Sequence, residues 1–177
     1  DHIILQEDEF VRVAGLALDF VGKNEALATL GIRPTRPDTG YGYIQYHEEE
    51  VSEGIHRVKT FTEKPAREVA QQFLDSGDFL WNAGIFIWNT KSILHALEKN
   101  LLEVYDAFAE VEPALCTEKE NAAVEKAFVT SPSISVDYGI MEKAENVYTL
   151  PASFGWSDLG TWASLYVEKE KDYLQNA

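Results

Sequence analysis

The chain has 177 residues, of which 45% are hydrophobic and 25% are charged, and this balance excludes an intrinsically disordered polypeptide. Its length fits a single domain with a core of its own. Acidic residues outnumber lysine and arginine by 30 to 15, which gives a formal net charge of −15. Because phosphate groups of long nucleic acids and anionic membranes are bound through clustered cations, so acidic a domain is poorly suited to either partner.

The cysteine content, the distribution of apolar residues and the start of the chain further restrict the class of protein. Cys116 is the single cysteine, so the chain cannot form an internal disulfide, which agrees with a cytoplasmic setting. We find no run of 18 apolar residues and no charged-then-apolar leader, and we expect neither a membrane span nor a signal peptide. Since the chain opens abruptly at Asp1, we expect it to be a piece of a longer protein.

The first half of the chain alternates between helical and extended patterns. Helical spacing of apolar residues predicts an amphipathic helix over 7–21. Proline and glycine make 33–42 a loop, because neither regular structure tolerates that density of both. Apolar, β-branched and aromatic residues predict three strands in this half, at 26–32, 41–49 and 54–64.

The second half continues the alternation. We predict a central strand over 81–89, because it is bulky on both faces. Thr117 and Glu120 have the spacing of a capping box at the start of a helix. The other predicted elements are helices at 66–77, 91–99, 101–111, 118–129 and 160–174 and a strand at 145–151. Interleaved strands and helices indicate one layered α/β domain over residues 1–177, with no linker or repeat.

Two short stretches carry polar groups suited to a ligand. In "PTRPDTGYGYI" (34–44), Gly40 and Gly42 flank Tyr41 and permit close approach of a ligand to the backbone, although an ordinary glycine-rich turn is the better reading of this stretch by itself. In "FTEKP" (61–65), Glu63 and Lys64 end a strand, where they suit a sugar hydroxyl and a phosphate or form an ordinary solvated pair.

Three further polar residues stand in motifs of mixed character. Asn82 heads the apolar "WNAGIFIW" (81–88), where its amide points into a pocket or caps nearby backbone groups. Asp137 in "SISVDYGIMEK" (133–143) suits a sugar hydroxyl or a helix N-terminus. Asp158 stands between tryptophans and glycines in "FGWSDLGTW" (154–162), as a turn residue or as a partner of Asp1 on Mg²⁺, which is bound through oxygen ligands.

The patterns for other chemistries are missing from the sequence. The four histidines, His2, His47, His56 and His95, are scattered without the spacing of a zinc site. The sequence contains no nucleophile elbow for Ser/His/Asp catalysis. Cys116 has no histidine nearby to activate it, so we expect it to be inert.

The order of these motifs resembles that of the sugar-nucleotide pyrophosphorylases. The series "DHIIL", "LGIRPTRPDTGYGYI", "FTEKP", "FLWNAGIFIW", "SISVDYGIMEK" and "FGWSDLGTW" is most similar to mannose-1-phosphate guanylyltransferases, and it runs from Asp1 to about Trp162. The resemblance implies a Rossmann-like nucleotide-diphospho-sugar transferase fold, with a mixed sheet flanked by helices. It also implies transfer of a guanylyl group from GTP to mannose 1-phosphate, giving GDP-mannose and pyrophosphate.

The resemblance assigns roles residue by residue. It implies that Asp1 and Asp158 hold Mg²⁺, and that Lys64 binds the sugar phosphate. Glu63 would hold sugar hydroxyls. The remaining residues would line the sugar-nucleotide cleft and the mannose pocket, namely Gly40, Tyr41, Gly42, Asn82 and Asp137. The family's tryptophans and glycines would then form a rigid frame that directs Asp158 toward the metal ion.

One departure from the family pattern leaves alternatives open. The family's glycine-rich nucleotide loop, "GGxGxRLWPxSR", should lie upstream of Asp1, so we expect residues 1–177 alone to be inactive or very weak, and truncated at the N-terminus of the fold. The base is read mainly by that missing part, so another sugar-1-phosphate nucleotidyltransferase remains an alternative, as does a non-catalytic sugar-phosphate-binding paralogue. A glycosidase that uses two of Glu63, Asp137 and Asp158 is a third reading. A homo-oligomer is left open.

Overall fold

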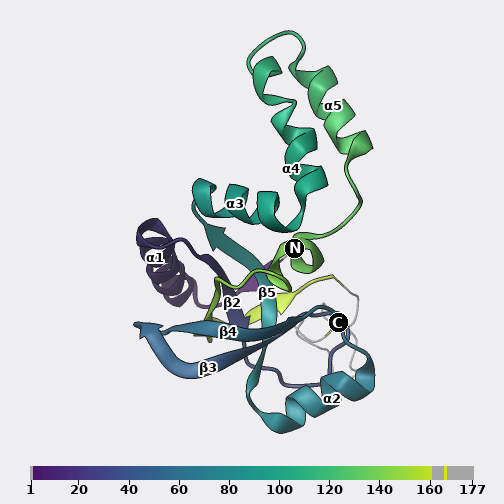
Figure 1. The fold of residues 1–177 in the computed structure, drawn as a ribbon. Helices are drawn as coiled ribbons and strands as arrows, with labels where there is room; N and C mark the ends of the chain where they lie inside the picture. Colours follow the sequence, from purple (N-terminus) through teal and green to yellow (C-terminus); the bar gives the residue numbers. More distant parts are fainter. Residues whose placement is uncertain (1, 161–165, 167–177) are drawn as a thin grey trace.

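The structure is a computed structural model that describes residues 2–160 and Tyr166 (Figure 1). Its centre is a five-stranded mixed sheet in the order β2-β5-β3-β4-β6, which closes on itself because β6 also pairs with β2. The strands are β2 (Leu27–Ile32), β3 (Tyr43–Ser52), β4 (Ile55–Thr62), β5 (Phe79–Trp88) and β6 (Val147–Ala152). The mixed sheet flanked by helices that the sequence predicts is therefore confirmed.

The register of β2 explains how the sheet closes. β2 runs parallel to β6, from Leu27 opposite Val147 to Ile32 opposite Ala152, whereas the other pairs in this sheet are antiparallel. β5 pairs with β2 on one side and with β3 on the other, which confirms the central position predicted from its bulky residues. β2 is almost wholly buried, as expected of an apolar strand that is covered on both faces.

The helices lie around this sheet and beyond it. α1 (Glu7–Lys23) buries Val13, Ala17 and Val21, the stripe expected of an amphipathic helix, against the core. α4 (Leu102–Ala109) and α5 (Glu120–Thr130) stand out from the sheet as an antiparallel pair (Figure 1). The other helices are α2 (Arg67–Ser76), α3 (Thr90–Asn100) and the short turns η1 (Glu112–Ala114) and η2 (Asp137–Met141).

The helices of the described chain lack the properties of a membrane span. Within residues 2–160, none of the helices has both the length and the apolar character that crossing a bilayer requires.

Two three-residue strands join the ends of the described chain. β1 (His2–Ile4) pairs antiparallel with β7 (Trp156–Asp158), and His2 lies opposite Asp158. We did not predict either strand, because three residues are too few to display a period. Leu5 and Gln6 continue the contact, since their backbone N–H groups donate to the carbonyl of Phe154 at 3.1 and 3.0 Å.

The remaining sequence predictions agree with the structure except at one helix start. The predicted helices and strands between 7 and 151 are all present, with bounds that differ by a few residues. The capping box is wrong: α5 begins at Glu120, Lys119 is its N-cap, and no side chain caps it. Glu120 instead accepts a hydrogen bond from the N–H of Cys116 at 2.7 Å, one residue before the predicted Thr117. The predicted closing helix over 160–174 lies almost wholly outside the described residues.

Candidate functional site

A cavity of about 260 Å³ gathers the predicted site residues at one end of the sheet. Eight of the nine predicted residues line it, and they come from five separate parts of the chain: Gly40, Tyr41, Gly42, Glu63, Lys64, Asn82, Asp137 and Asp158. The ninth, Asp1, lies outside the described residues. Predicted residues up to 118 positions apart in sequence, Gly40 and Asp158, thus meet in one cavity.

Five further residues line the same cavity, and four of them were not predicted from the sequence. These are His2, Ala83, Gly84, Phe86 and Trp156, of which only Trp156 was expected, as part of the frame. His2 reaches the cavity because β1 pairs with β7, and its ring meets Trp156 edge-on at 5.7 Å. Its position beside Asp1 was the one available signal. Gly84 and Phe86 follow Asn82 at the two-residue period of a strand, which could have indicated them.

Glu63 and Lys64 form an ion pair at the mouth of the cavity. Lys64 Nζ lies 2.7 Å from Glu63 Oε1, and the Glu63 side chain is only 7% exposed whereas that of Lys64 is 56% exposed. Lys64 has a φ of 46°, in the left-handed region, so the backbone turns sharply between strand β4 and Pro65. The pair is therefore one buried carboxylate held by an accessible ammonium group, which differs from an ordinary solvated pair.

The surroundings of Glu63 shift its pKa. Burial raises the pKa of the Glu63 carboxyl; the Lys64 ammonium opposes this rise, and the charges of Asp137 and Glu142 add to it. The hydrogen bond from Lys64 to Glu63 raises the pKa of the lysine in turn. Glu63 Oε2 is buried and has no hydrogen-bond partner within the described chain. An oxygen in that state suits a hydroxyl donor supplied by a ligand.

Gly42 is required at its position by the approach of Glu63. A Cβ atom at residue 42 would lie 2.5 Å from Glu63 Oε2 and 3.3 Å from the Cβ of Asn82. The carbonyl of Gly42 also accepts the N–H of Asn82 at 2.8 Å, which ties the loop to β5. The backbone N–H of Gly40 donates to Asp38 Oδ1 at 2.9 Å, as in a turn. The glycine-rich turn is therefore present, and the group that approaches the backbone closely at Gly42 is the Glu63 side chain.

Asn82 combines the two roles that the sequence left open. Its Oδ1 accepts hydrogen bonds from Thr29 Oγ1 at 2.8 Å and from the N–H of Gly84 at 3.1 Å. Its Nδ2 donates to Asp137 Oδ1 at 3.1 Å. The amide thus caps a backbone group and also faces the cavity, where it orients a carboxylate.

The short turn η2 and the residue that follows it, Glu142, present two carboxylates to the site region. η2 is a π-helical turn, in which the N–H of Glu142 donates to the carbonyl of Asp137 at 3.0 Å. The wider turn separates the two residues by five positions, and π-turns recur at functional sites. Asp137 meets Asn82, while Glu142 Oε1 accepts the N–H of Glu63 at 2.8 Å. η2 therefore connects β5 to the Glu63–Lys64 turn.

Aromatic rings form the wall beside Asp158. Tyr41 packs edge-on against Trp81 at 5.1 Å and against Trp156 at 5.2 Å. Burial, together with the charge of Asp38, raises the pKa of the Tyr41 hydroxyl. Trp156 stands two residues before Asp158 in β7, and the Asp158 Oδ1 accepts the N–H of Gly160 at 2.9 Å. This packing fixes the strand that carries Asp158, whereas Trp162 lies outside the described residues.

The donor set of Asp158 fits a magnesium ion. Gly160 holds one carboxylate oxygen, and no hydrogen bond to the other, Oδ2, is found within residues 2–160. In that part of the chain no three histidine, cysteine or acidic residues cluster as a ready-made metal site. Mg²⁺ needs no such cluster, because it usually takes one or two carboxylates and completes its octahedron with water and phosphate oxygens.

Comparison with known proteins identifies the family. The family model described as "Nucleotidyl transferase" matches residues 1–175. The chain belongs to the nucleotidyl transferase family. It spans little more than a third of the length of the curated relatives that it matches, because the alignments cover 35–37% of theirs.

The relatives include three biosynthetic proteins of bacteria. The alginate biosynthesis protein AlgA of Pseudomonas fluorescens is 35% identical over 178 residues, which cover 99% of this chain and 37% of AlgA. The xanthan biosynthesis protein XanB of Xanthomonas campestris is 38% identical and covers 100% of this chain and 37% of XanB. The mannose-1-phosphate guanylyltransferase of Escherichia coli K12 is 36% identical and covers 94% of this chain and 35% of that enzyme.

Solved structures support the nucleotidyl transferase fold. A protein of Thermus thermophilus, titled mannose-1-phosphate geranyltransferase, superposes with a TM-score of 0.80 at 28% identity, over 96% of this chain and 48% of that one. A protein of Helicobacter pylori titled mannose-6-phosphate isomerase gives a TM-score of 0.75 at 24% identity, over 89% and 61% of the two chains. The second likeness shows the fold alone.

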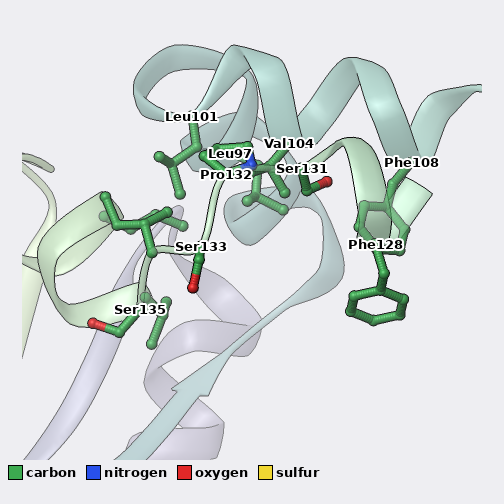
Figure 2. Close-up of a pocket in the computed structure, with 12 residues that line it drawn as sticks. Leu97, Leu101, Val104, Phe108, Phe128, Ser131, Pro132, Ser133 and Ser135 are labelled. Atoms are coloured by element: carbon green, nitrogen blue, oxygen red, sulfur yellow. The ribbon is translucent and has the colours of Figure 1, made fainter. Parts of the chain in front are cut away.

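The chain also has an apolar groove, which is larger and less polar than the site cavity. None of the predicted site residues in the described part of the chain lines this groove. It measures about 580 Å³ and lies between α3, α4, α5 and residues 131–136 (Figure 2). Its lining is mostly aliphatic and aromatic, with Phe108 and Phe128 edge-on at 5.1 Å. The groove is therefore distinct from the site in both position and chemistry.

Proposed function

We propose that the protein to which this chain belongs transfers a guanylyl group from GTP to mannose 1-phosphate, and that this chain supplies the sugar-phosphate half of the site. The observation that carries the proposal is the convergence of Glu63, Lys64, Asn82 and Asp137 in one cavity beside Asp158. Four matched relatives bear the name mannose-1-phosphate guanylyltransferase, from Escherichia coli and Salmonella, which supports this sugar and this nucleotide.

The chemistry asks little of the protein beyond alignment and charge neutralisation. An oxygen of the mannose 1-phosphate is already anionic, so it attacks the α-phosphorus of GTP without a general base. A bond forms between that oxygen and the α-phosphorus, the bond from the α-phosphorus to the bridging oxygen breaks, and pyrophosphate leaves with the electron pair. In this proposal Lys64 holds the sugar phosphate, and Glu63 and Asp137 accept hydrogen bonds from the sugar hydroxyls.

A divalent metal ion fits the same proposal. Nucleotidyltransferases of this kind generally use one, and we propose Mg²⁺ held by Asp1 and Asp158. His2, the neighbour of Asp1, lies opposite Asp158 in the β1–β7 pair, which supports the choice of these two residues. When bound, Mg²⁺ would supply charge neutralisation at the phosphates. This matters more in a chain with a net charge of −15. Because GTP is an intracellular nucleotide, we place the reaction in the cytoplasm.

Release of pyrophosphate by the full-length protein tests the proposal directly. With mannose 1-phosphate and Mg²⁺, GTP should release pyrophosphate faster than ATP, UTP or dTTP, and Asp158→Asn should abolish the release. Residues 1–177 alone should bind mannose 1-phosphate but show no turnover. Preference for another nucleotide would indicate a different nucleotidyltransferase, and no release with any nucleotide would contradict the proposed activity. EDTA-insensitive release of reducing sugar from a mannoside would favour a glycosidase instead.

A further inference from the structure

The orientation of the Asn82 amide is fixed from both sides. Two donors, the Thr29 hydroxyl and the Gly84 N–H, point at its oxygen, and an acceptor, Asp137 Oδ1, faces its nitrogen. An amide flipped by 180° would set its oxygen against the carboxylate of Asp137 and an N–H against the N–H of Gly84, so only one orientation satisfies all three neighbours. The Asn82 nitrogen is therefore held toward Asp137 before any ligand arrives.

Thr29 makes this contact from outside the cavity. It lies in β2, its side chain is fully buried, and it is absent from the cavity lining. Its hydroxyl donates to Asn82 across 53 positions of sequence at 2.8 Å. A buried hydroxyl contributes to stability chiefly through such a bond, because burial removes its water partners. Thr29 can thus influence a ligand only through Asn82.

A neighbouring threonine shows that the contact is specific. Thr149 lies opposite Thr29 in the parallel β2–β6 pair and is also fully buried. The Thr149 hydroxyl has no hydrogen-bond partner within the described residues. The two positions share residue type, strand environment and burial, and they differ in whether the hydroxyl contacts the site.

We propose that Thr29 is a positioning residue of the sugar-phosphate site, which acts through Asn82 to hold Asp137 in its binding orientation. The inference rests on the proposed function, since it assigns Asp137 to the sugar. Without the Thr29 hydroxyl, the Asn82 oxygen keeps only the backbone donor of Gly84, which has a φ of 69°. The amide then rotates more freely, and the ligand must fix it on binding.

Three substitutions of similar size test the proposal. Thr29→Val removes the hydroxyl and keeps the shape, Thr29→Ser keeps the hydroxyl, and Thr149→Val removes a buried hydroxyl that makes no contact with the site. Titration calorimetry would measure binding of mannose 1-phosphate to each variant. The side-chain amide signals of Asn82 in ¹⁵N-labelled protein would report the amide without any ligand, and thermal unfolding would report stability.

We expect Thr29→Val to weaken binding by about tenfold, the loss typical of one buried hydrogen bond, and to shift the Asn82 amide signals. Thr29→Ser should restore both readouts, and Thr149→Val should resemble the unmodified chain. Wild-type binding and unchanged Asn82 signals in Thr29→Val would overturn the proposal, as would equal weakening by Thr149→Val. If even the unmodified chain fails to bind mannose 1-phosphate, the proposal that this chain supplies the sugar-phosphate half of the site fails, while the Asn82 signals still decide whether Thr29 orients the amide.

Discussion

The site cavity and the apolar groove share one element, η2, and they are organised in opposite ways. Asp137 at the start of η2 lines the cavity, whereas Ile140 lines the groove. In the cavity, hydrogen bonds fix the side chains, as at Asn82 and at the Glu63–Lys64 pair. In the groove, apolar packing holds the lining side chains, as between Phe108 and Phe128. Hydrogen bonds fix the orientation of the polar groups in the cavity, whereas apolar packing mainly fixes the shape of the groove.

The largest effect is expected when the positive charge of Lys64 is removed from the cavity. Lys64→Gln should weaken mannose 1-phosphate binding by about 100-fold, because a hydrogen bond between charged groups contributes about 1.5–3 kcal/mol. Lys126→Gln is the matched control, since Lys126 lies on α5 and forms a 2.8 Å pair with Glu110 at the end of α4, and neither residue lines the cavity. Calorimetric titration of both variants distinguishes them. Equal weakening would mean that net charge, and not the position of Lys64, controls binding.

A smaller effect is expected when the close approach at Gly42 is blocked. Gly42→Ala should weaken binding by about tenfold, because the new Cβ displaces Glu63 Oε2 from its position 2.5 Å away. Gly22→Ala on α1 is the control, since a Cβ at that position meets no atom within 4 Å. This control should leave binding unchanged and stabilise the fold by less than about 0.8 kcal/mol, because Gly22 lies in the last turn of α1, where alanine's preference over glycine is smaller than in a helix interior. Unaltered binding by Gly42→Ala would contradict the tight contact.

The electrostatics of the cavity should be visible in the titration of Glu63. Carbon-13 NMR should give a Glu63 pKa above the ordinary 4.5, lower in Asp137→Asn and higher in Lys64→Gln. Because the folded-state pKa is raised, the folded chain binds more protons than the unfolded one between the two pKa values. This group's contribution to stability therefore falls as pH rises through that window. A pKa unchanged by both substitutions would exclude these neighbours as causes.

The smallest effect is expected in the groove. Phe128→Ala removes a side chain that is 67% exposed and contacts Phe108 edge-on. The free energy of unfolding should fall by about 0.5–1.5 kcal/mol, the contribution of one aromatic pair, as measured by urea unfolding. Binding of mannose 1-phosphate should stay the same. A change in binding would show that η2 transmits effects from the groove to the cavity.

The sequence predicts the residues that line the site better than the residues that hold them in position. Glu63, Lys64, Asn82 and Asp137 stand in recognisable motifs, and the structure brings them together. The supporting contacts are tertiary and leave no local pattern: Thr29 reads as one residue of an apolar strand, yet its hydroxyl reaches Asn82. β1 and β7 were missed for the same reason, since each gains its partner from the opposite end of the described chain.

Secondary structure was predictable wherever a pattern extends over several residues. The apolar stripe of α1 and the bulky run of β5 each specify an element by themselves. The start of α5 depends on a single turn, and there Glu120 bonds to Cys116 in place of the predicted partner. The closure of the sheet was equally unpredictable, because it depends on the distant pairing of β6 with β2 and β4.

The parallel pairing of β2 with β6 has a consequence for how the chain folds. Leu27 meets Val147, so pairing of these strands closes a loop of about 120 residues. Closing so long a loop is entropically costly, and parallel pairs between distant strands form slowly. The hairpin of β3 and β4, which are joined by a turn at Gly54, needs no such closure. Hydrogen exchange during refolding should therefore protect β3 and β4 before β2 and β6.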